Sequence, residues 1–375
     1  MRKLGAMPDH MLRRFLTCGY INGASPDNVQ PASLDLTMSD EVLQIDSIML
    51  PRRDMFVTQL KNVLGGIRVR KNMGRRRRRS TKGFHLAKGV PYLVRLQEFL
   101  ELPPDIYGFT NPKSTTGRLD IHVRLVVDKT PRFDSVGRNY GGKLWALVVS
   151  RSFDIQVCEG TKLMQLRLFN GDTRIGQTEL EIEMKSNPIL WSRLGQPWDA
   201  GDISITDSDG SCLLTLDVES PVIGWRAKRN APEVDLAAKG KLSVEKYFDR
   251  VVADHGVVAF APNLFHIFST SQYVRIPPHL ACEMRPMDEK SGEFRAHYAG
   301  YIDPGWGWGK EGEGRGRPLT LEIRPTEPLR IGKGLPVAKI GFERLETPPE
   351  TPYDAGTPTY SRQLGPQLAR QFKPV

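Results

Sequence analysis

Short apolar runs recur along the whole chain and are separated by glycine and proline residues. Five clear examples read VPYLVRL, KLWALVVS, KLMQLRLF, LTLEI and LPVAKIGF. The chain has 35 glycines and 28 prolines, many of which separate runs of this kind. Short strands bounded by turn residues are typical of β-sandwich and barrel-like proteins. The pattern therefore predicts a mainly β protein.

Two segments carry helix signals instead. The segment MPDHMLRRFLTCG has Pro8 and Asp9 where a first helical turn would begin, and it ends on a glycine. The segment LSVEKYFDRVVADHG offers Ser243 as N-cap and Gly256 as terminator. We predict a short helix in each.

The strand pattern repeats once along the chain. Pro103-Pro104 and Pro277-Pro278 follow similar strands, and Phe169 and Phe342 end similar strands. The separation along the chain is nearly the same for both pairs of markers, and the order of strands, turns and polar motifs between the markers is also kept. We infer two diverged copies of one β domain.

The length of 375 residues suits such a pair of domains. We predict that the first repeat covers residues 1–215 and includes a polar turn at 111–118. The second repeat is predicted to cover residues 216–375 and to include an aspartate hairpin, a candidate catalytic glutamate and a C-terminal closing tail.

The positive charge of the chain is concentrated in one segment. Lys and Arg number 53 against 43 Asp and Glu, for a net charge of +10, and nine of the basic residues lie between Arg68 and Lys82 without an acidic one. The rest of the chain is nearly neutral. A run such as Arg75–Arg79 repels itself, which predicts a solvated loop, with an anion- or nucleic-acid-binding arm as the alternative. The segment Asn72–Lys82 holds no aromatic residue to stack on bases, so nucleic acid is not the expected partner.

Several classes of protein are excluded by what the sequence lacks. It has no apolar run long enough to span a membrane and no signal-peptide pattern at its start, so we expect a cytoplasmic protein without membrane contact. The histidines show no zinc-binding spacing, which excludes zinc deaminases and zincins. The four cysteines are far apart and are predicted to be reduced, buried and inert: Cys18, Cys158, Cys212 and Cys282.

The turn NPKSTTGR, residues 111–118, is the most informative polar motif. It places two cations, Lys113 and Arg118, beside the hydroxyls of Ser114, Thr115 and Thr116. Several donors in one turn can bind phosphate oxygens, and arginine suits a bidentate acceptor. An ordinary capped turn is the alternative.

A second candidate site lies in the sequence YIDPGW followed by the strand LTLEI. In an alternating strand, Thr320 and Glu322 point to one face and the leucines to the other. A carboxylate held in a pocket in this way has a raised pKa and can act as a general acid or base. The alternative is a charge that faces solvent.

These motifs together resemble one known family. ELPPDIYGFTNPKSTTGR, YIDPGW, LTLEI, LPVAKIGF, the early segment QPASLDL and the tail YSRQLGP are similar to the dCTP deaminases, relatives of the trimeric dUTPases, in the double-length form that fuses two domains. The resemblance implies two tandem dUTPase-like distorted β-barrel or jelly-roll domains with a few short helices. It implies metal-free deamination of the cytosine ring, with Mg²⁺ bound through the nucleotide triphosphate and no zinc.

The resemblance also implies roles for particular residues. Glu322 matches the catalytic glutamate, and Ser114 and Arg118 match the serine and arginine that orient water and stabilise charge. The tail is expected to close over bound nucleotide, with Arg362 or Arg370 meeting phosphate. The predicted substrate-binding residues are Lys113, Thr115, Asp303, Ala299, Tyr360 and Gln363.

Each repeat departs from the family pattern in a different place. The first repeat has Leu147 or Ala146 at the glutamate position and Asp134-Ser-Val in place of D-P-G. The second has the segment 285–290, RPMDEK, in place of the hydroxyl-rich turn. We therefore predict composite sites that join the turn of a first repeat to the glutamate and hairpin of a second. The sequence leaves open whether both belong to one chain.

The predicted function is hydrolysis of dCTP to dUTP and ammonia by a homo-oligomer with a trimer-like arrangement of repeats. The predicted ligands are dCTP and dUTP, with dTTP as a candidate inhibitor. One alternative is a dUTP diphosphatase, or a bifunctional enzyme, in which Asp303 activates water against the α-phosphate. The other is a non-catalytic protein that binds nucleotide or nucleic acid.

Overall fold

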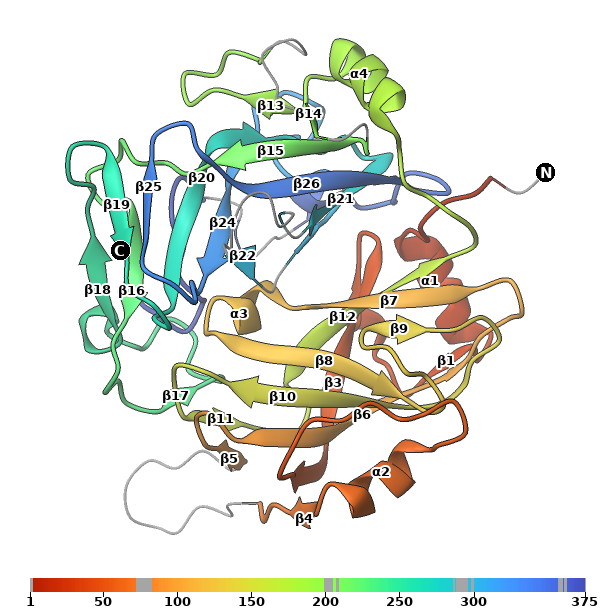
Figure 1. Cartoon of the computed structure of the whole chain (residues 1–375). Coiled ribbons are helices and arrows are strands. Elements are labelled where there is room, and N and C mark those ends of the chain that lie inside the picture. The colour runs from red at the N-terminus through yellow and green to blue at the C-terminus, as the bar shows by residue number, and fades with distance from the viewer. Residues whose placement is uncertain are drawn as a thin grey trace.

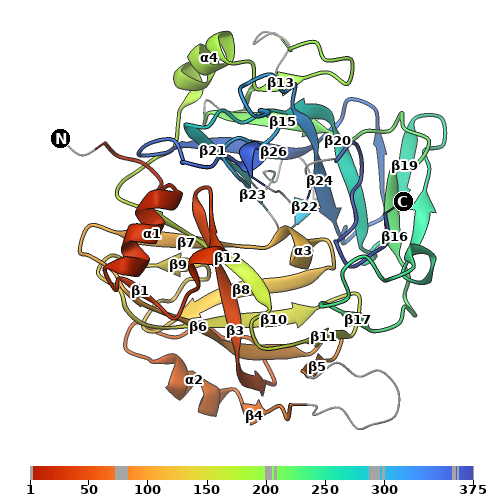
Figure 2. The same ribbon diagram turned by 180° about the vertical axis from the view of Figure 1, so that it is seen from behind.

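The computed structural model describes residues 3–71, 83–198, 205–206, 209–285, 287, 296–297, 300–356, 360 and 363–374. The predicted basic loop with Arg75–Arg79 lies outside these residues. Within them, the two halves of the chain form separate groups of antiparallel strands that face each other, as Figure 1 and the reverse view in Figure 2 show.

The first half of the chain forms a ten-stranded sheet around one long strand, β3 (Ser33–Gln44). The path of the sheet is β8-β10-β6-β3-β12-β7-β9, and β1, β2 and β4 pair beside it. The other strands are β1 (Ile21–Asn22), β2 (Val29–Gln30), β4 (Ile67–Arg68), β6 (Pro91–Glu101), β7 (Tyr107–Pro112), β8 (Ile121–Val127), β9 (Ser135–Val136), β10 (Gly141–Ser150) and β12 (Lys162–Phe169).

The second half forms two main sheets. One has the order β18-β16-β20-β24-β22, with β13 beside it, and the other has the order β14-β15-β26-β21-β23. The strands are β13 (Leu190–Trp191), β14 (Ile205–Thr206), β15 (Ser211–Thr215), β16 (Gly224–Ala227), β18 (Phe248–Val251), β20 (His266–Val274), β21 (Leu280–Arg285), β22 (Ala296–His297), β23 (Tyr301–Ile302), β24 (Arg317–Ile323) and β26 (Pro336–Arg344).

The strand order confirms the repetition expected from the sequence. The order β8-β10-β6 of the first half returns as β22-β24-β20, and β3-β12-β7-β9 returns as β15-β26-β21-β23. Corresponding strands follow one another at a nearly constant offset along the chain. Strand β15 lies before residue 216 but pairs with β26. The division into units at residue 215 stays a prediction, because strand pairing does not measure independent folding.

Smaller elements connect the two halves. Strand β17 (Val234–Asp235) pairs with β11 (Ile155–Val157) of the first half, which also pairs with β5 (Phe84–Leu86). Strand β19 (Val257–Phe260) pairs with β25 (Leu329–Gly332) within the second half.

Of the two predicted helices, one is confirmed and one is wrong. Helix α1 (Asp9–Thr17) begins at the predicted residue and buries Leu12 and Phe15. The segment 243–256 instead forms a 3-10 turn, Val244–Lys246, and then β18, because pairing with β16 buries Phe248 in the core. Sequence analysis missed α2 (Val57–Val63), the single turn α3 (Ser114–Gly117) and α4 (Gln177–Ser186).

The apolar cores follow the two halves without being strictly separate. The larger core contains Leu36, Val94 and Ala146 of the first half, and Phe248 and Phe372 of the second half pack into it. A second core lies inside the second half, and a third covers the outer face of β10 beneath α2. Because Phe372 comes from the C-terminal tail, the tail belongs to the core of the molecule.

A buried ion cluster also joins the halves. Arg167 on β12 is 1% exposed, and its guanidinium donates to Glu343 at 2.5 Å and to Glu283 at 2.8 Å. Asn111 donates to the same Glu283 oxygen at 2.9 Å. The two carboxylates raise the pKa of Arg167 further above its usual range although burial opposes this, so the cluster stays charged.

The cysteines are free, as expected, but not all are buried. Cys212 and Cys282 are buried, Cys158 is half-buried and Cys18 is exposed, so the expectation of burial holds only for the first two. Cys18 is the C-cap residue that follows α1.

None of the helices that the structure describes is long and apolar enough to cross a membrane.

Candidate active site

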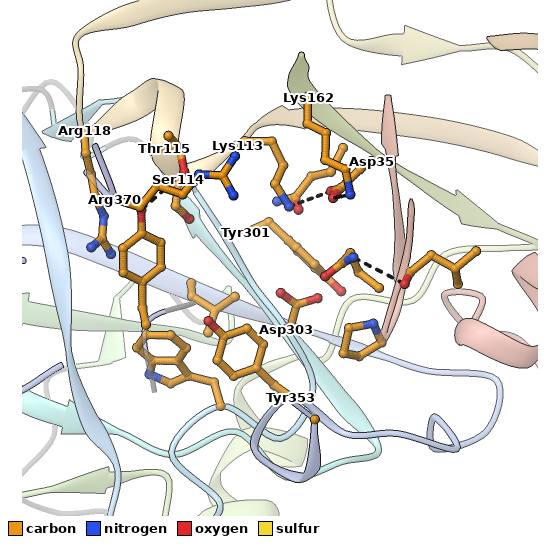
Figure 3. Close-up of a pocket in the computed structure, with 18 of the residues that line it drawn as sticks. Asp35, Lys113, Ser114, Thr115, Arg118, Lys162, Tyr301, Asp303, Tyr353 and Arg370 are labelled. Carbon is orange, nitrogen blue, oxygen red and sulfur yellow. Dashed lines mark hydrogen bonds and ion pairs between the residues drawn. The ribbon is translucent and has the colours of Figure 1, made fainter. Parts of the chain in front are cut away.

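A cavity of about 680 Å³ lies between the two halves and receives side chains from both (Figure 3). The first half contributes Asp35, Lys113, Ser114, Thr115, Arg118 and Lys162. The second half contributes Tyr301, Asp303, Trp306, Thr320, Tyr353, Tyr360 and Arg370. The predicted phosphate turn and the predicted aspartate hairpin therefore meet within a single chain.

The turn presents its polar groups because α3 is only one turn long. Strand β7 ends at Pro112, Lys113 is still extended, and α3 ends at Gly117. The Thr116 hydroxyl donates to the carbonyl of Lys113 at 2.6 Å, so it stabilises the turn. Ser114 and Thr115 instead line the cavity.

Two lysines of the cavity share one buried carboxylate. Asp35 on β3 is 2% exposed and lies 2.5 Å from Nζ of Lys113 and 3.1 Å from Nζ of Lys162 (Figure 3). This arrangement fixes two ammonium groups side by side, where they can bind a polyanion. Sequence analysis missed Asp35 and Lys162 as site residues, although the segment QPASLDL contains the first of them.

Polar atoms of the second half face the cavity without partners. Among the described residues, Asp303 Oδ1, Thr320 Oγ1 and Trp306 Nε1 are buried and make no hydrogen bond. Buried polar groups normally have hydrogen-bond partners, so three such atoms without a partner in the protein indicate a place where a ligand or water binds. Burial raises the pKa of Asp303 from 3.8 to about 7, with Lys113 opposing the rise and Asp35 adding to it.

The raised pKa gives the stability of the ligand-free protein a defined pH dependence. Between about pH 4 and 7 the folded protein retains a proton on Asp303 that the unfolded chain has released. The stability that this proton contributes is complete below pH 4 and is lost as the pH rises through 7. Denaturant unfolding of the wild type and Asp303→Asn from pH 4 to 8 should show the wild type losing about 4 kcal/mol relative to the variant, because the pKa rises from 3.8 to about 7 and each pH unit of that rise corresponds to about 1.4 kcal/mol. If the free energy of unfolding changes with pH in the same way for both proteins, the raised pKa is contradicted.

Glu322 lies directly beneath the turn of the other half. It is 3% exposed, and a Cβ atom added to Gly117 would overlap the Glu322 carboxylate. Thr320, two residues earlier on β24, lines the cavity. The glutamate is thus buried at the contact between the halves and does not face solvent.

The C-terminal tail holds Arg118 from above. The Tyr360 ring lies 3.8 Å from the Arg118 guanidinium carbon, and Arg118 donates to the side-chain oxygen of Gln363 at 2.9 Å and to the carbonyl of Gln367 at 3.0 Å. Thr115 and Tyr360 lie within hydrogen-bonding distance, 3.3 Å. The tail therefore covers the turn in this structure, while its role over bound nucleotide stays a prediction.

Two of the predicted residues cannot be placed, and two others went unpredicted. Ala299 and Arg362 lie outside the described residues, whereas Arg370 lines the cavity. Tyr353 and Trp306 were not predicted; their ring centroids lie 5.2 Å apart, and both residues line the cavity together with Asp303. Burial raises the pKa of the Tyr353 hydroxyl, which keeps it a neutral donor.

The corresponding residues on the other side of the molecule have other partners. Asp134 pairs with Arg124 at 2.7 Å and accepts a hydrogen bond from the backbone of Leu125. Leu147, which stands at the glutamate position, packs in the third core beneath α2. Arg285 donates to the Ser211 hydroxyl at 2.8 Å. The fold and these contacts define a mainly β protein with a composite cavity between its two halves.

Comparison with known proteins agrees with this description. Residues 3–172 match the family model "2'-deoxycytidine 5'-triphosphate deaminase (DCD) N-terminal domain", and residues 203–372 match the model of the C-terminal domain of the same enzyme. The chain therefore belongs to the dCTP deaminase family. The crystal structure of 2'-deoxycytidine 5'-triphosphate deaminase from Agrobacterium tumefaciens superposes with a TM-score of 0.82 at 29% identity, covering 93% of this chain and all of that one.

Curated relatives match over shorter stretches. A protein named "dCTP deaminase, dUMP-forming" from Methanobrevibacter smithii is 35% identical over 117 residues, which is 29% of this chain and 55% of the relative. A protein of the same name from Bifidobacterium longum is 30% identical over 118 residues, 30% of this chain and 56% of the relative. The chain spans about half the length of the curated relatives it matches.

Proposed function

We propose that the protein hydrolyses dCTP to dUTP and ammonia at the cavity between its two halves. Water adds to the ring carbon that carries the amino group, a C–O bond forms, the C–N bond breaks and ammonia leaves. The observation that carries the proposal is the placement of the Glu322 carboxylate against Gly117, beneath the turn that bears Ser114 and Arg118.

Glu322 is the proposed proton carrier. It would take a proton from the attacking water and later give one to the departing ammonia. Ser114 would orient the water. Arg118 would supply positive charge near the ring. Its two terminal nitrogens donate to the tail, whereas Nε has no hydrogen-bond partner and could donate to the substrate.

The triphosphate would occupy the basic side of the cavity. Lys113, Lys162 and Arg370 line that side, and Asp35 holds the two lysines in place. Mg²⁺ would enter as part of the nucleotide complex. The described residues contain no group of three His, Cys, Asp or Glu side chains that could hold a metal ion.

A product assay tests the proposal directly. Purified protein incubated with dCTP and Mg²⁺ should release ammonia and dUTP in equal amounts. Neither product would appear if the protein only binds nucleotide, and cytosine nucleotides without the triphosphate should be poorer substrates because they leave the lysines unpaired.

A dUMP-forming enzyme is the second candidate function. Asp303 lies in the same cavity as Lys113, its pKa is raised to about 7, and a carboxylate of that pKa can accept a proton from water near neutrality. The relatives from Methanobrevibacter smithii and Bifidobacterium longum carry that name. Pyrophosphate and dUMP, formed together with ammonia from dCTP, would support this second function.

We further propose that each chain builds its own site. The turn of the first half and Glu322 of the second meet within one chain, so two defective chains cannot repair each other. Co-expressed Ser114→Ala and Glu322→Gln chains, purified together through different tags, should be as inactive as either alone. Recovered turnover would place the site between chains.

A further inference from the structure

A buried ion pair crosses the contact between the halves next to the proposed active site. Asp120 of the first half is fully buried, and the Arg324 guanidinium donates to both of its carboxylate oxygens. Ser152 also donates to Asp120, at 2.6 Å, and accepts from Arg324 at 3.0 Å. The third guanidinium nitrogen of Arg324, Nη1, donates to the carbonyl of Asn263. All these groups are held in one fixed arrangement.

The two members of the pair flank the two halves of the site. Asp120 follows Arg118 by two residues and closes the turn through a hydrogen bond from its backbone to Gly117, at 2.8 Å. Arg324 follows Glu322 by two residues, at the end of β24. The pair therefore ties the segment bearing the turn to the segment bearing the glutamate, a short distance from where Gly117 and Glu322 touch.

The backbone of Asp120 has a conformation that few residue types tolerate. Its φ is +57°, in the left-handed region that glycine occupies most easily after a helical turn. An aspartate tolerates this conformation better than most residues. Burying its carboxylate is unfavourable unless the charge is paired, and Arg324 supplies that pairing with a bidentate fork.

We propose that Asp120 and Arg324 are positioning residues that hold the Glu322 carboxylate at a fixed place beneath the Ser114–Arg118 turn. The proposal rests on the proposed deamination, since it assigns the pair a role in placing the proton carrier of that reaction. Neither residue lines the cavity between the halves, so neither is expected to contact the nucleotide.

The surroundings make Arg324 dependent on Asp120. Arg324 also lines a surface pocket to which the described residues contribute Lys88, Arg151, Lys228 and Arg229 and no acidic side chain. Without the Asp120 carboxylate, repulsion from these cations would favour movement of Arg324 toward solvent. The end of β24 would then lose its contact with the turn.

Kinetics of Asp120→Asn and Arg324→Met test the proposal. Asn tolerates the left-handed backbone, so the first variant removes the charge and one of the two acceptor oxygens that Arg324 uses without straining the turn. We expect kcat for dCTP to fall by about 10-fold to 100-fold in both, because small misplacements of a reacting group have effects of this size. KM should change by less than about threefold, since Lys113 and Lys162 remain in place. Arg324→Lys keeps the charge without the fork and should lie between.

Arg151→Met is the matched control. Arg151 lines the same surface pocket as Arg324 and is exposed. Its backbone N–H donates to the carbonyl of Asp120, a bond that the substitution leaves in place, and its charge acts on the Asp120 carboxylate less than that of Arg324 does. It should keep the kcat and KM of the wild type. Variants of Asp120 and Arg324 that unfold at lower temperature but keep the kcat of the wild type would reduce the pair to a structural role and overturn the proposal.

Amide hydrogen exchange gives a second readout that does not need turnover. In Arg324→Met, residues 113–120 and 317–324 should exchange faster than in the wild type, while α1 should be unchanged. If both segments exchange at the same rate in Arg324→Met as in the wild type, the proposal is overturned. Absence of turnover in the wild type would contradict the deaminase function alone, and the exchange data would still decide whether the pair holds the two segments together.

Discussion

Glu322→Gln should lower kcat for dCTP deamination by about 10²-fold to 10⁴-fold, the range that general acid–base catalysis contributes. Glutamine keeps the shape of the side chain but cannot accept a proton from water. The side chain is 3% exposed and is held against Gly117, so an isosteric replacement should remain in place. Binding of dUTP, measured by calorimetry, should be nearly unchanged because the lysines and Asp303 are untouched.

Glu159→Gln provides the matched control for this substitution. Glu159 lines the same cavity, but its side chain is 47% exposed and pairs with Lys71 at 3.4 Å. Its replacement should leave kcat within about twofold of the wild type, since exposed ion pairs contribute little. Undiminished turnover in Glu322→Gln would exclude Glu322 as the proton carrier, whatever the behaviour of the control.

Arg167→Met should destabilise the protein by about 3–5 kcal/mol, the usual cost of removing one partner from a buried ion pair. The substitution would leave the carboxylates of Glu283 and Glu343 close together at the contact between the halves, with Glu343 only 7% exposed. Burial already raises the pKa of Glu343 although Arg167 opposes this, and loss of the arginine would raise it further. Thermal and denaturant unfolding should both report the loss.

Two further variants test whether the loss comes from unpaired buried charge: one at the cluster and one at an exposed ion pair. The triple variant Arg167→Met, Glu283→Gln, Glu343→Gln removes all three charges and should recover much of the lost stability. Arg174→Met breaks an exposed pair with Asp172, whose side chains are 67% and 68% exposed, and should change stability by less than about 1 kcal/mol. A loss below about 1 kcal/mol in Arg167→Met would contradict the importance of the cluster.

Much of the fold could be predicted because its signals are local. Apolar runs between glycine and proline predicted strands, and the nearly constant offset between similar motifs predicted the repetition that the strand order confirms. Helix α1 was predicted from Pro8 and Asp9. The prediction of a helix in segment 243–256 was wrong because the pairing of β18 with β16 stabilises a strand there more than the helical caps stabilise a helix. That pairing cannot be predicted from the local sequence.

The meeting of turn and glutamate could be predicted only in part. The complementary losses in the two repeats indicated a composite site, but its assembly within one chain depends on how the halves pack. Asp35 and Lys162 come from strands that pair in the sheet, far from the turn in sequence, so no motif links them to Lys113. The Asp120–Arg324 pair has the same origin, since its members are 204 residues apart.

We expect helix α2 to limit each chain to one copy of the proposed site. In the second half, the face of β24 that bears Glu322 is covered by the turn of the first half; in the first half, the corresponding face of β10 is covered by Val57 and Leu60 of α2. A further copy of the turn could not dock there without displacing that helix. The helix thus covers the β10 surface on which another module would pack, as a capping repeat covers the last core face of a solenoid. The expected stoichiometry is one nucleotide for each chain, although each chain holds two copies of the fold.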